Sequence, residues 1–225
     1  MVLKLYGSRL TTASPRVEVV LIEKKIPYEF IEVNLFPDVA EHKTVAYKEK
    51  HPFGKVPYID DDGFILFESR AICRYLETVY DGYGMKLSPS TSDVRATALF
   101  EQAVSIETTE FEPSAIKAGH MLIDILLGIP FNQADFDVAI AGLSEKLDGY
   151  EAILGKHRYL AGDIKELTLA DLFHLPYGAW VTQAGSNILS TKGPNVARWW
   201  NEISTRESWK QVQDMVPDVL KNLKP

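Results

Sequence analysis

Apolar residues at alternating and helical spacing divide the start of the chain into short elements. Val2 to Tyr6 predicts a strand, and the following segment predicts a helix in which Val17, Val20 and Leu21 share one face. A second strand is expected from Tyr28 to Val33. The resulting β-α-β order implies a right-handed crossover between two parallel strands.

A hairpin and a helix are expected next. The segments Pro57 to Ile59 and Phe64 to Phe67 predict strands, and Asp62-Gly63 between them is a strong turn signal. The helix after them begins near Ser69 and ends near Tyr80. The order β-α-β followed by β-β-α predicts a thioredoxin-like α/β domain with a mixed four-stranded sheet.

The rest of the chain has helical patterning. Glycine and proline residues between Gly82 and Ser90 form a connection typical of a domain boundary. We therefore expect a first domain at residues 1–82, a linker at 83–92 and an all-helical domain at 93–225. Candidate helices span residues 93–118, 135–154, 169–180 and 195–205, with a short one near Trp209.

Thr168-Leu169-Ala170-Asp171 has the pattern of a capping box. The Thr168 hydroxyl can accept from the Asp171 N–H, and the Asp171 carboxylate can accept from the Thr168 N–H. We interpret Asp171 as structural, with a cost on the order of 1 kcal/mol for the loss of one cap.

Composition excludes several classes of protein. The 225 residues are 46% hydrophobic, which is enough for a sizeable core. The net charge of −7 and the absence of a basic stripe argue against nucleic acid as a partner. There is no apolar run long enough to span a membrane and no signal segment, so we expect a cytoplasmic protein without a membrane partner. One cysteine, Cys73, excludes an internal disulfide and a thiolate metal site.

The stretch His51-Pro52-Phe53-Gly54-Lys55-Val56-Pro57-Tyr58-Ile59 predicts a backbone-binding site. An X-Pro bond adopts the cis form at modest cost, which would turn the chain before the strand and expose the N–H and C=O of Val56. An exposed pair of this kind suits a short antiparallel ladder with an extended peptide.

The stretch Phe67-Glu68-Ser69-Arg70-Ala71-Ile72 predicts a site for an amino-acid head group. Ser69 is expected to be the N-cap of the helix that it precedes, and the N–H groups of a helix start favour a carboxylate. Glu68, one residue earlier, can hold an ammonium beside it. The two stretches together therefore indicate a small peptide ligand.

These two stretches, with their spacing, resemble the glutathione-binding half of the cytosolic glutathione transferases, most closely the phi class. The resemblance extends to Lys4–Gly7, Glu41–Lys43, Tyr159–Asp163 and Leu167–Asp171. It implies a thioredoxin-like domain followed by an all-helical domain (α/β plus all-α), glutathione as co-substrate, no metal, and a homodimer.

The expected chemistry requires the thiol of glutathione as a thiolate, because a free thiol has a pKa of about 8.5. Lowering that pKa by about two units takes roughly 2.7 kcal/mol, which a hydroxyl and a helix N-terminus can supply. The hydroxyls after the first strand belong to Ser8, Thr11, Thr12 and Ser14. By resemblance, the catalytic serine of phi enzymes falls on Thr11, and that of delta and theta enzymes falls on Thr12.

Other residues compete for the catalytic role. Threonine adds a methyl group and stiffens the side chain, so its hydroxyl has fewer ways to point at sulfur than that of serine. For Ser14 we expect helix capping, for Tyr6 packing, and for Cys73 burial as an inert side chain. No cysteine occurs between Gly7 and Arg16, which disfavours thioltransferase chemistry and leaves conjugation to an electrophile or reduction of a hydroperoxide.

The resemblance and the residue types give the remaining candidate contacts. A cationic cluster of His42, Lys43 and Lys55 is expected to receive the glycine carboxylate of glutathione. The complete glutathione-binding set is His42, Lys43, Lys55, Val56, Pro57, Glu68, Ser69 and Arg70. The candidates for a hydrophobic second substrate are Leu10, Phe36, Phe111, Ile116 and His120.

Two alternatives to a transferase remain at this stage. The first is a non-catalytic ligandin-type carrier, which keeps the glutathione site and presents lipophilic compounds, and the threonine substitution motivates it. The second is a transferase-like interaction module, which would purify with a stoichiometric protein partner.

Overall fold

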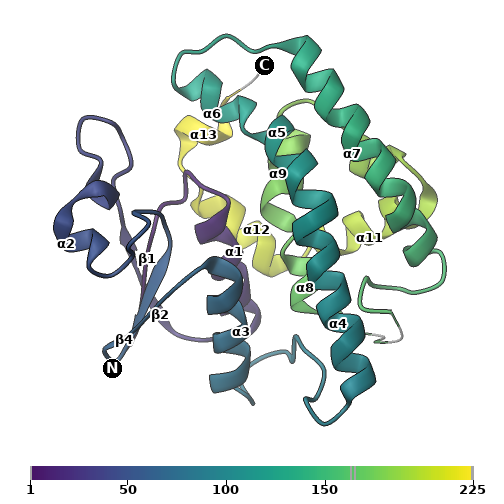
Figure 1. Ribbon diagram of the computed structural model, residues 1–225, viewed down its shortest axis with the longest axis horizontal. Helices are drawn as coiled ribbons and strands as arrows, with labels where there is room; N and C mark the ends of the chain where they lie inside the picture. Colours follow the sequence, from purple (N-terminus) through teal and green to yellow (C-terminus); the bar gives the residue numbers. More distant parts are fainter. Residues whose placement is uncertain (1, 163, 165, 224–225) are drawn as a thin grey trace. The chain divides into compact units, whose positions relative to one another are not determined.

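The computed structural model describes residues 2–162, 164 and 166–223. They form two compact units, one ending at Lys86 and one beginning at Leu87 (Figure 1). Asp163, the last residue of the motif that begins at Tyr159, lies outside the described residues.

The first unit contains the predicted mixed sheet. Strands β1 and β2 are parallel, whereas β3 pairs antiparallel with both β1 and β4, and the spatial order is β2-β1-β3-β4. The elements are β1 (Leu3–Gly7), α1 (Ala13–Glu23), β2 (Tyr28–Glu32), η1 (Glu41–Lys43), α2 (Val45–Lys48), β3 (Tyr58–Asp61), β4 (Phe64–Phe67) and α3 (Ser69–Val79). The β-α-β and β-β-α prediction is confirmed.

Helices α1 and α3 pack against each other through their apolar faces. Val17, Val20 and Leu21 of α1 are fully buried, as their spacing predicts. Cys73 of α3 is also fully buried, and burial raises the pKa of its thiol to about 12. A thiol that stays protonated at neutral pH is a poor nucleophile, which agrees with its interpretation as an inert core residue.

The predicted turn between β3 and β4 has left-handed backbone conformations at both central residues. Asp62 has φ 54° and Gly63 has φ 90°. Two positive φ values match the twist of the flanking strands, which is why Asp-Gly is favoured at this position.

The second unit is helical. Its longer helices are α4 (Val94–Ile106), α5 (Glu112–Gly119), α7 (Gln133–Leu154), α9 (Leu175–Gln183), α11 (Pro194–Ser204) and α12 (Glu207–Met215). The shorter segments are η2 (Glu107–Phe111, π-helical), α6 (Met121–Leu126), α8 (Leu169–Leu172), α10 (Ile188–Thr191) and α13 (Asp218–Lys221). None of the described helices is both long enough and apolar enough to cross a membrane.

Of two helices expected to be regular, the first is continuous but contains a π-helical segment, and the second is interrupted. The helix expected at 93–118 consists of α4, η2 and α5, and Pro113 lies in the first turn of α5. The helix expected at 169–180 is divided into α8 and α9, with Pro176 in the first turn of α9. Proline has no N–H to donate inside a helix but fits its first turn, which accounts for the new start at α9.

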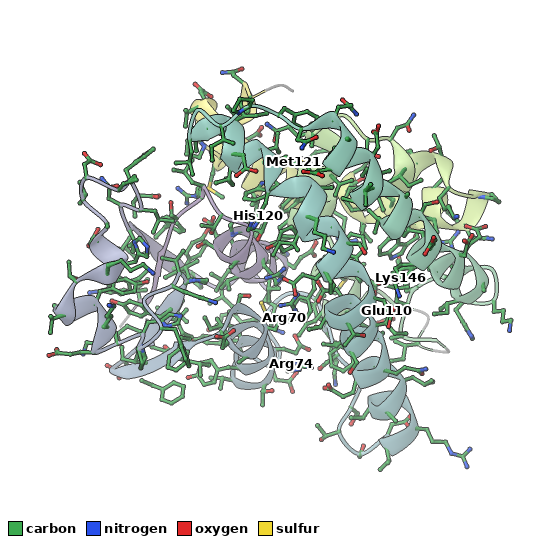
Figure 2. All side chains as sticks on the ribbon, turned by 45° about the horizontal axis from the view of Figure 1, so that its top comes forward. Arg70, Arg74, Glu110, His120, Met121 and Lys146 are labelled. Atoms are coloured by element: carbon green, nitrogen blue, oxygen red, sulfur yellow. The ribbon has the colours of Figure 1, made fainter. Side chains whose placement is uncertain are left out.

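The π-helical segment η2 packs against α7. Glu110 of η2 and Lys146 of α7 form an ion pair of 2.7 Å, and both side chains are close to half exposed (Figure 2). Because solvent screens such a pair, it makes only a small contribution to stability.

The capping box at the start of α8 is confirmed. The Asp171 carboxylate accepts the N–H of Thr168 at 3.0 Å and also the N–H of Leu160 at 3.1 Å. It further accepts the indole N–H of Trp199 at 3.0 Å. Asp171 is fully buried and joins three segments of the helical unit, which is more than a cap alone would do.

Candidate functional site

The turn before β3 has the predicted cis peptide bond between Val56 and Pro57. The ladder between β1 and β3 begins at the pair Tyr6–Tyr58, so Val56 lies outside it. Among the described residues, no backbone hydrogen bond joins Val56 to another residue. Its N–H and C=O are therefore available to a ligand that extends along this edge.

The start of α3 differs in detail from the prediction. Ser69 is the first helical residue, and the N-cap position belongs to Glu68, whose side chain makes no capping bond. The expectation that Ser69 is the N-cap is therefore wrong by one residue. The Ser69 hydroxyl instead accepts a hydrogen bond of 3.0 Å from the guanidinium of Arg16, a residue only 2% exposed.

Glu68 has an unusual backbone conformation. Its φ is 72° and its ψ is 106°, outside the regions that non-glycine residues normally adopt. Conformations of this kind concentrate at ligand sites, where surrounding contacts hold them. Here Glu68 is exposed beside the first turn of α3, and Arg70 and Arg74 follow one turn apart (Figure 2).

The basic residues are brought together by close backbone contacts. Lys43 donates from Nζ to the carbonyl of Gly54 at 2.8 Å, and the Tyr47 hydroxyl donates to the carbonyl of Lys55 at 2.8 Å. Gly54 has φ 56°, and a Cβ there would lie 2.8 Å from the carbonyl oxygen of His42. Glycine is therefore required for this approach, which places Lys55 beside η1.

His42 differs from the expected cation. Burial, and then the charges of Lys43 and Lys48, lower the pKa of His42 below its usual value of 6.5. The ring is therefore neutral at pH 7, and the positive charge of this cluster comes from the lysines. The Nδ1 atom of His42 is buried and has no hydrogen-bond partner within the described part of the chain.

The hydroxyls after β1 are held by hydrogen bonds within the loop. Thr11 donates from Oγ1 to the Ser8 carbonyl at 2.8 Å and accepts the N–H of Ser14 at 3.4 Å, so it takes the capping role expected of Ser14. The Ser14 hydroxyl accepts the N–H of Ser8 at 3.0 Å. Thr12 occupies the N-cap position of α1, but its side chain makes no capping bond.

Tyr6 stacks on Tyr58, with ring centroids 4.5 Å apart and planes inclined by 12°. This contact agrees with the packing role expected of Tyr6. The two rings cover one face of the sheet next to the Val56–Pro57 turn, because Tyr6 and Tyr58 are paired in the register of β1 and β3.

The five residues proposed for a hydrophobic substrate have different environments. Leu10 is half-buried and Phe36 is exposed in the first unit, and Ile116 is half-buried in the second. The His120 ring is exposed and lies 6.2 Å from the ring of Tyr177 and 6.0 Å from that of Trp180.

Phe111 is a correction. Its side chain is fully buried, with its ring 4.6 Å from that of His174 and 6.2 Å from that of Tyr150. A fully enclosed ring cannot contact a substrate, and Phe111 is a core residue of the helical unit.

Two arginines near the site were not identified from the sequence. Arg16 donates to the Ser69 hydroxyl, and Arg9 forms a salt bridge with Glu18. A charged residue inside the apolar run of a buried helix is the signal that could have indicated both contacts. Among the described residues, no group of three or more His, Cys, Asp or Glu side chains is arranged to hold a metal ion.

The geometry is that of a two-part protein: a thioredoxin-like sheet unit with a cis-proline turn at the start of β3, followed by a helical unit. The family model "Glutathione S-transferase, N-terminal domain" matches residues 1–78, and "Glutathione S-transferase, C-terminal domain" matches residues 95–207. The chain belongs to the glutathione S-transferase family, for which glutathione is the co-substrate.

Individual relatives support the phi-class resemblance. Glutathione S-transferase hmp2 of Hypomyces subiculosus is 41% identical over 218 residues, which cover 93% of this chain and 96% of that protein. The crystal structure of glutathione transferase F7 from Populus trichocarpa has a TM-score of 0.88 and 33% identity, covering 96% of this chain and all of that one. Glutathione S-transferase I from maize, in complex with an atrazine glutathione conjugate, has a TM-score of 0.84 and 28% identity, with 99% of each chain covered.

Proposed function

We propose that the first unit binds glutathione in an extended form and stabilises its thiolate for attack on a hydrophobic electrophile or a hydroperoxide. The observation that carries this proposal is the left-handed Glu68 beside Ser69 at the start of α3. This conformation directs a carboxylate and a set of helix N–H groups to one place, which suits the ammonium and carboxylate of one amino acid.

The remaining residues have complementary roles in the proposal. Val56 pairs with the ligand backbone, and the lysines of the basic cluster with neutral His42 bind the glycine carboxylate. Pro57 and Arg70 flank these contacts at the turn before β3 and in the first turn of α3. In this proposal residues 1–82 bind glutathione. Residues 93–225 contribute part of the electrophile contact, through Ile116 and His120. Leu10 and Phe36 of the first unit join these two as electrophile contacts.

One hydroxyl, of Thr11 or Thr12, donates to the sulfur. Thr11 corresponds to the phi-class serine, but its hydroxyl would first have to leave the Ser8 carbonyl. Replacing one hydrogen bond by another costs less than about 1.5 kcal/mol. The Thr12 side chain makes no capping bond that it would have to give up. Thr12 is less exposed than Thr11, however, with only 6% of the residue accessible.

Assembly and location complete the proposal. We infer a homodimer in the cytoplasm, as is typical of the family. Phe53, 67% exposed beside the glutathione turn, supports an apolar contact with a second copy. Sedimentation of the wild type and Phe53→Ser would test it: the variant should be more monomeric, and an unchanged dimer fraction would exclude Phe53 from the contact.

Calorimetric titration with glutathione, with thiolate absorbance read in the same samples from about pH 6 to about pH 9, tests the function. Saturable binding with thiolate present near neutrality supports a transferase. Ser69→Ala should weaken binding, whereas Thr11→Ala or Thr12→Ala should raise the pKa of the bound thiol and Thr→Ser at the same position should not. Absence of binding would reject the proposal. Binding without thiolate would favour the ligandin-type carrier. The structural argument for a carrier is that the Thr11 hydroxyl already donates its hydrogen bond to the Ser8 carbonyl.

A further inference from the structure

We propose that Arg9 is a positioning residue for thiol activation, because its bidentate salt bridge with Glu18 fixes the loop that carries Thr11 and Thr12. The proposal rests on the proposed function, since it concerns how the hydroxyl donor is held. Arg9 belongs neither to the glutathione-binding set nor to the hydroxyl donors.

The salt bridge is buried and has fixed geometry. Arg9 donates from Nη2 to Oε1 of Glu18 at 2.7 Å and from Nε to Oε2 at 3.1 Å. The side chain of Arg9 is 20% exposed and that of Glu18 is fully buried. A bidentate arginine–carboxylate pair fixes both the distance and the orientation of its partners, which a single charge cannot do.

Neighbouring groups hold the pair in place. The guanidinium carbon of Arg9 lies 3.9 Å from the ring centroid of Phe30 on β2, a cation–π contact. The Tyr28 hydroxyl donates to the same Oε1 of Glu18 at 3.0 Å. Arg9 therefore connects the loop to both α1 and β2.

The residue before Arg9 is fixed as well. Ser8 donates from Oγ to Oε1 of Glu32 at 2.6 Å and from its N–H to the Ser14 hydroxyl at 3.0 Å. Its carbonyl accepts both the N–H and the hydroxyl of Thr11. Arg9 follows directly in the chain, so movement at Arg9 shifts the atoms that orient Thr11 and the N-cap residue Thr12.

A hydroxyl stabilises a thiolate only when it is aimed at sulfur, and a displacement of about 1 Å can cost up to about 100-fold in rate. The contacts proposed for the peptide, at Val56, Glu68 and Ser69, lie on other elements. Loss of the bridge should therefore affect thiol ionisation and turnover while leaving peptide binding intact.

The test compares the wild type with Arg9→Met, Arg9→Lys and the pair Arg9→Met/Glu18→Gln. Methionine keeps an apolar stem over Phe30, and the pair avoids an unpartnered buried carboxylate if Arg9→Met folds poorly. The measurements are the pKa of the bound glutathione thiol by thiolate absorbance, and kcat and KM for glutathione with 1-chloro-2,4-dinitrobenzene. Lys24→Met is the matched control, because it breaks a buried salt bridge just after the C-terminal end of α1, at the opposite end of that helix from the loop.

For Arg9→Met we expect the bound thiol pKa to rise by about one unit, from about 6.5 to about 7.5, which lowers the thiolate fraction at pH 7 about threefold. The kcat at pH 7 should fall about threefold and recover toward pH 9, with KM for glutathione within about twofold of wild type. Arg9→Lys should lie close to Arg9→Met, since it keeps the charge and loses the fork.

An unchanged thiol pKa in folded Arg9→Met and in the double variant would overturn the proposal. So would wild-type behaviour of Arg9→Lys, which would assign the effect to charge, or the same thiol shift in Lys24→Met. Failure of the wild type to bind glutathione or form thiolate would instead reject the proposed function, so the two failures are distinct.

Discussion

The ammonium of Lys24 lies 2.7 Å from Oε2 of Glu77, and the two side chains are only 1% and 4% exposed. Lys24 follows α1 directly and Glu77 is in the last turn of α3, so the pair joins the two helices that pack together in the first unit. Because both charges are removed from water, neither is tolerated without the other.

Lys24→Met should therefore lower the free energy of unfolding by about 3–5 kcal/mol, since it leaves the Glu77 carboxylate buried without its ammonium. Lys24→Met/Glu77→Leu should recover most of that loss, because two apolar side chains of similar volume replace the pair. Urea unfolding of both variants measures the difference. A single variant that costs less than about 1 kcal/mol would mean that water reaches the carboxylate.

Asp171→Ala should cost more than an ordinary cap. It removes the acceptor of three N–H groups, from Thr168, Leu160 and Trp199, and each buried donor left without a partner costs about 1–3 kcal/mol. We expect a loss of at least about 3 kcal/mol in unfolding free energy, against about 1 kcal/mol for Thr168→Ala. Equal losses in the two variants, measured by thermal and urea unfolding, would show that only the cap matters.

The sequence predicted the features that depend on short-range patterns of residues or on the backbone preferences of single residues. The β-α-β and β-β-α element order, the Asp62-Gly63 turn, the cis Val56–Pro57 bond and the Thr168–Asp171 box are confirmed because each follows from short-range rules. The helix expected at 93–118 is present, but its π-helical segment at 107–111 was not predicted, although Pro113 was visible in the sequence.

What the sequence could not predict is the choice among partners of similar chemistry. Four hydroxyls lie within seven residues, and only the folded loop assigns Thr11 to Ser8 and Ser14. The neutral state of His42 likewise depends on burial and on Lys48, which periodicity does not reveal. Phe111 was placed near a substrate by its helix position, but which face of a helix is enclosed is decided by its neighbours.

The pH dependence of peptide binding should report the role of His42. In the free protein burial lowers its pKa, so the neutral ring is favoured and the protein loses stability as pH falls below about 6.5. A bound carboxylate raises that pKa, so the affinity for S-methylglutathione, which has no thiol to ionise, should increase as pH falls from about 7 to about 5.5. His42→Gln should flatten this dependence in calorimetric titrations, whereas an identical slope in the variant would place the carboxylate away from His42.

Substitutions of Glu68 should change the stability of the protein and its affinity for glutathione independently. A non-glycine residue at φ 72° carries a strain of about 1–3 kcal/mol, which glycine avoids, although glycine loses about 0.5–1 kcal/mol of chain entropy on folding. Glu68→Gly should therefore melt at or above the wild-type temperature, whereas Glu68→Ala should not, because alanine keeps the strain. Both variants lack the carboxylate proposed to hold the ammonium of glutathione, so both should bind it at least about tenfold more weakly, a loss of about 1.4 kcal/mol. Thermal unfolding and calorimetric titration of the same samples test the two effects separately. Wild-type affinity in Glu68→Gly would mean that the backbone conformation, and not the side chain, recognises the ligand.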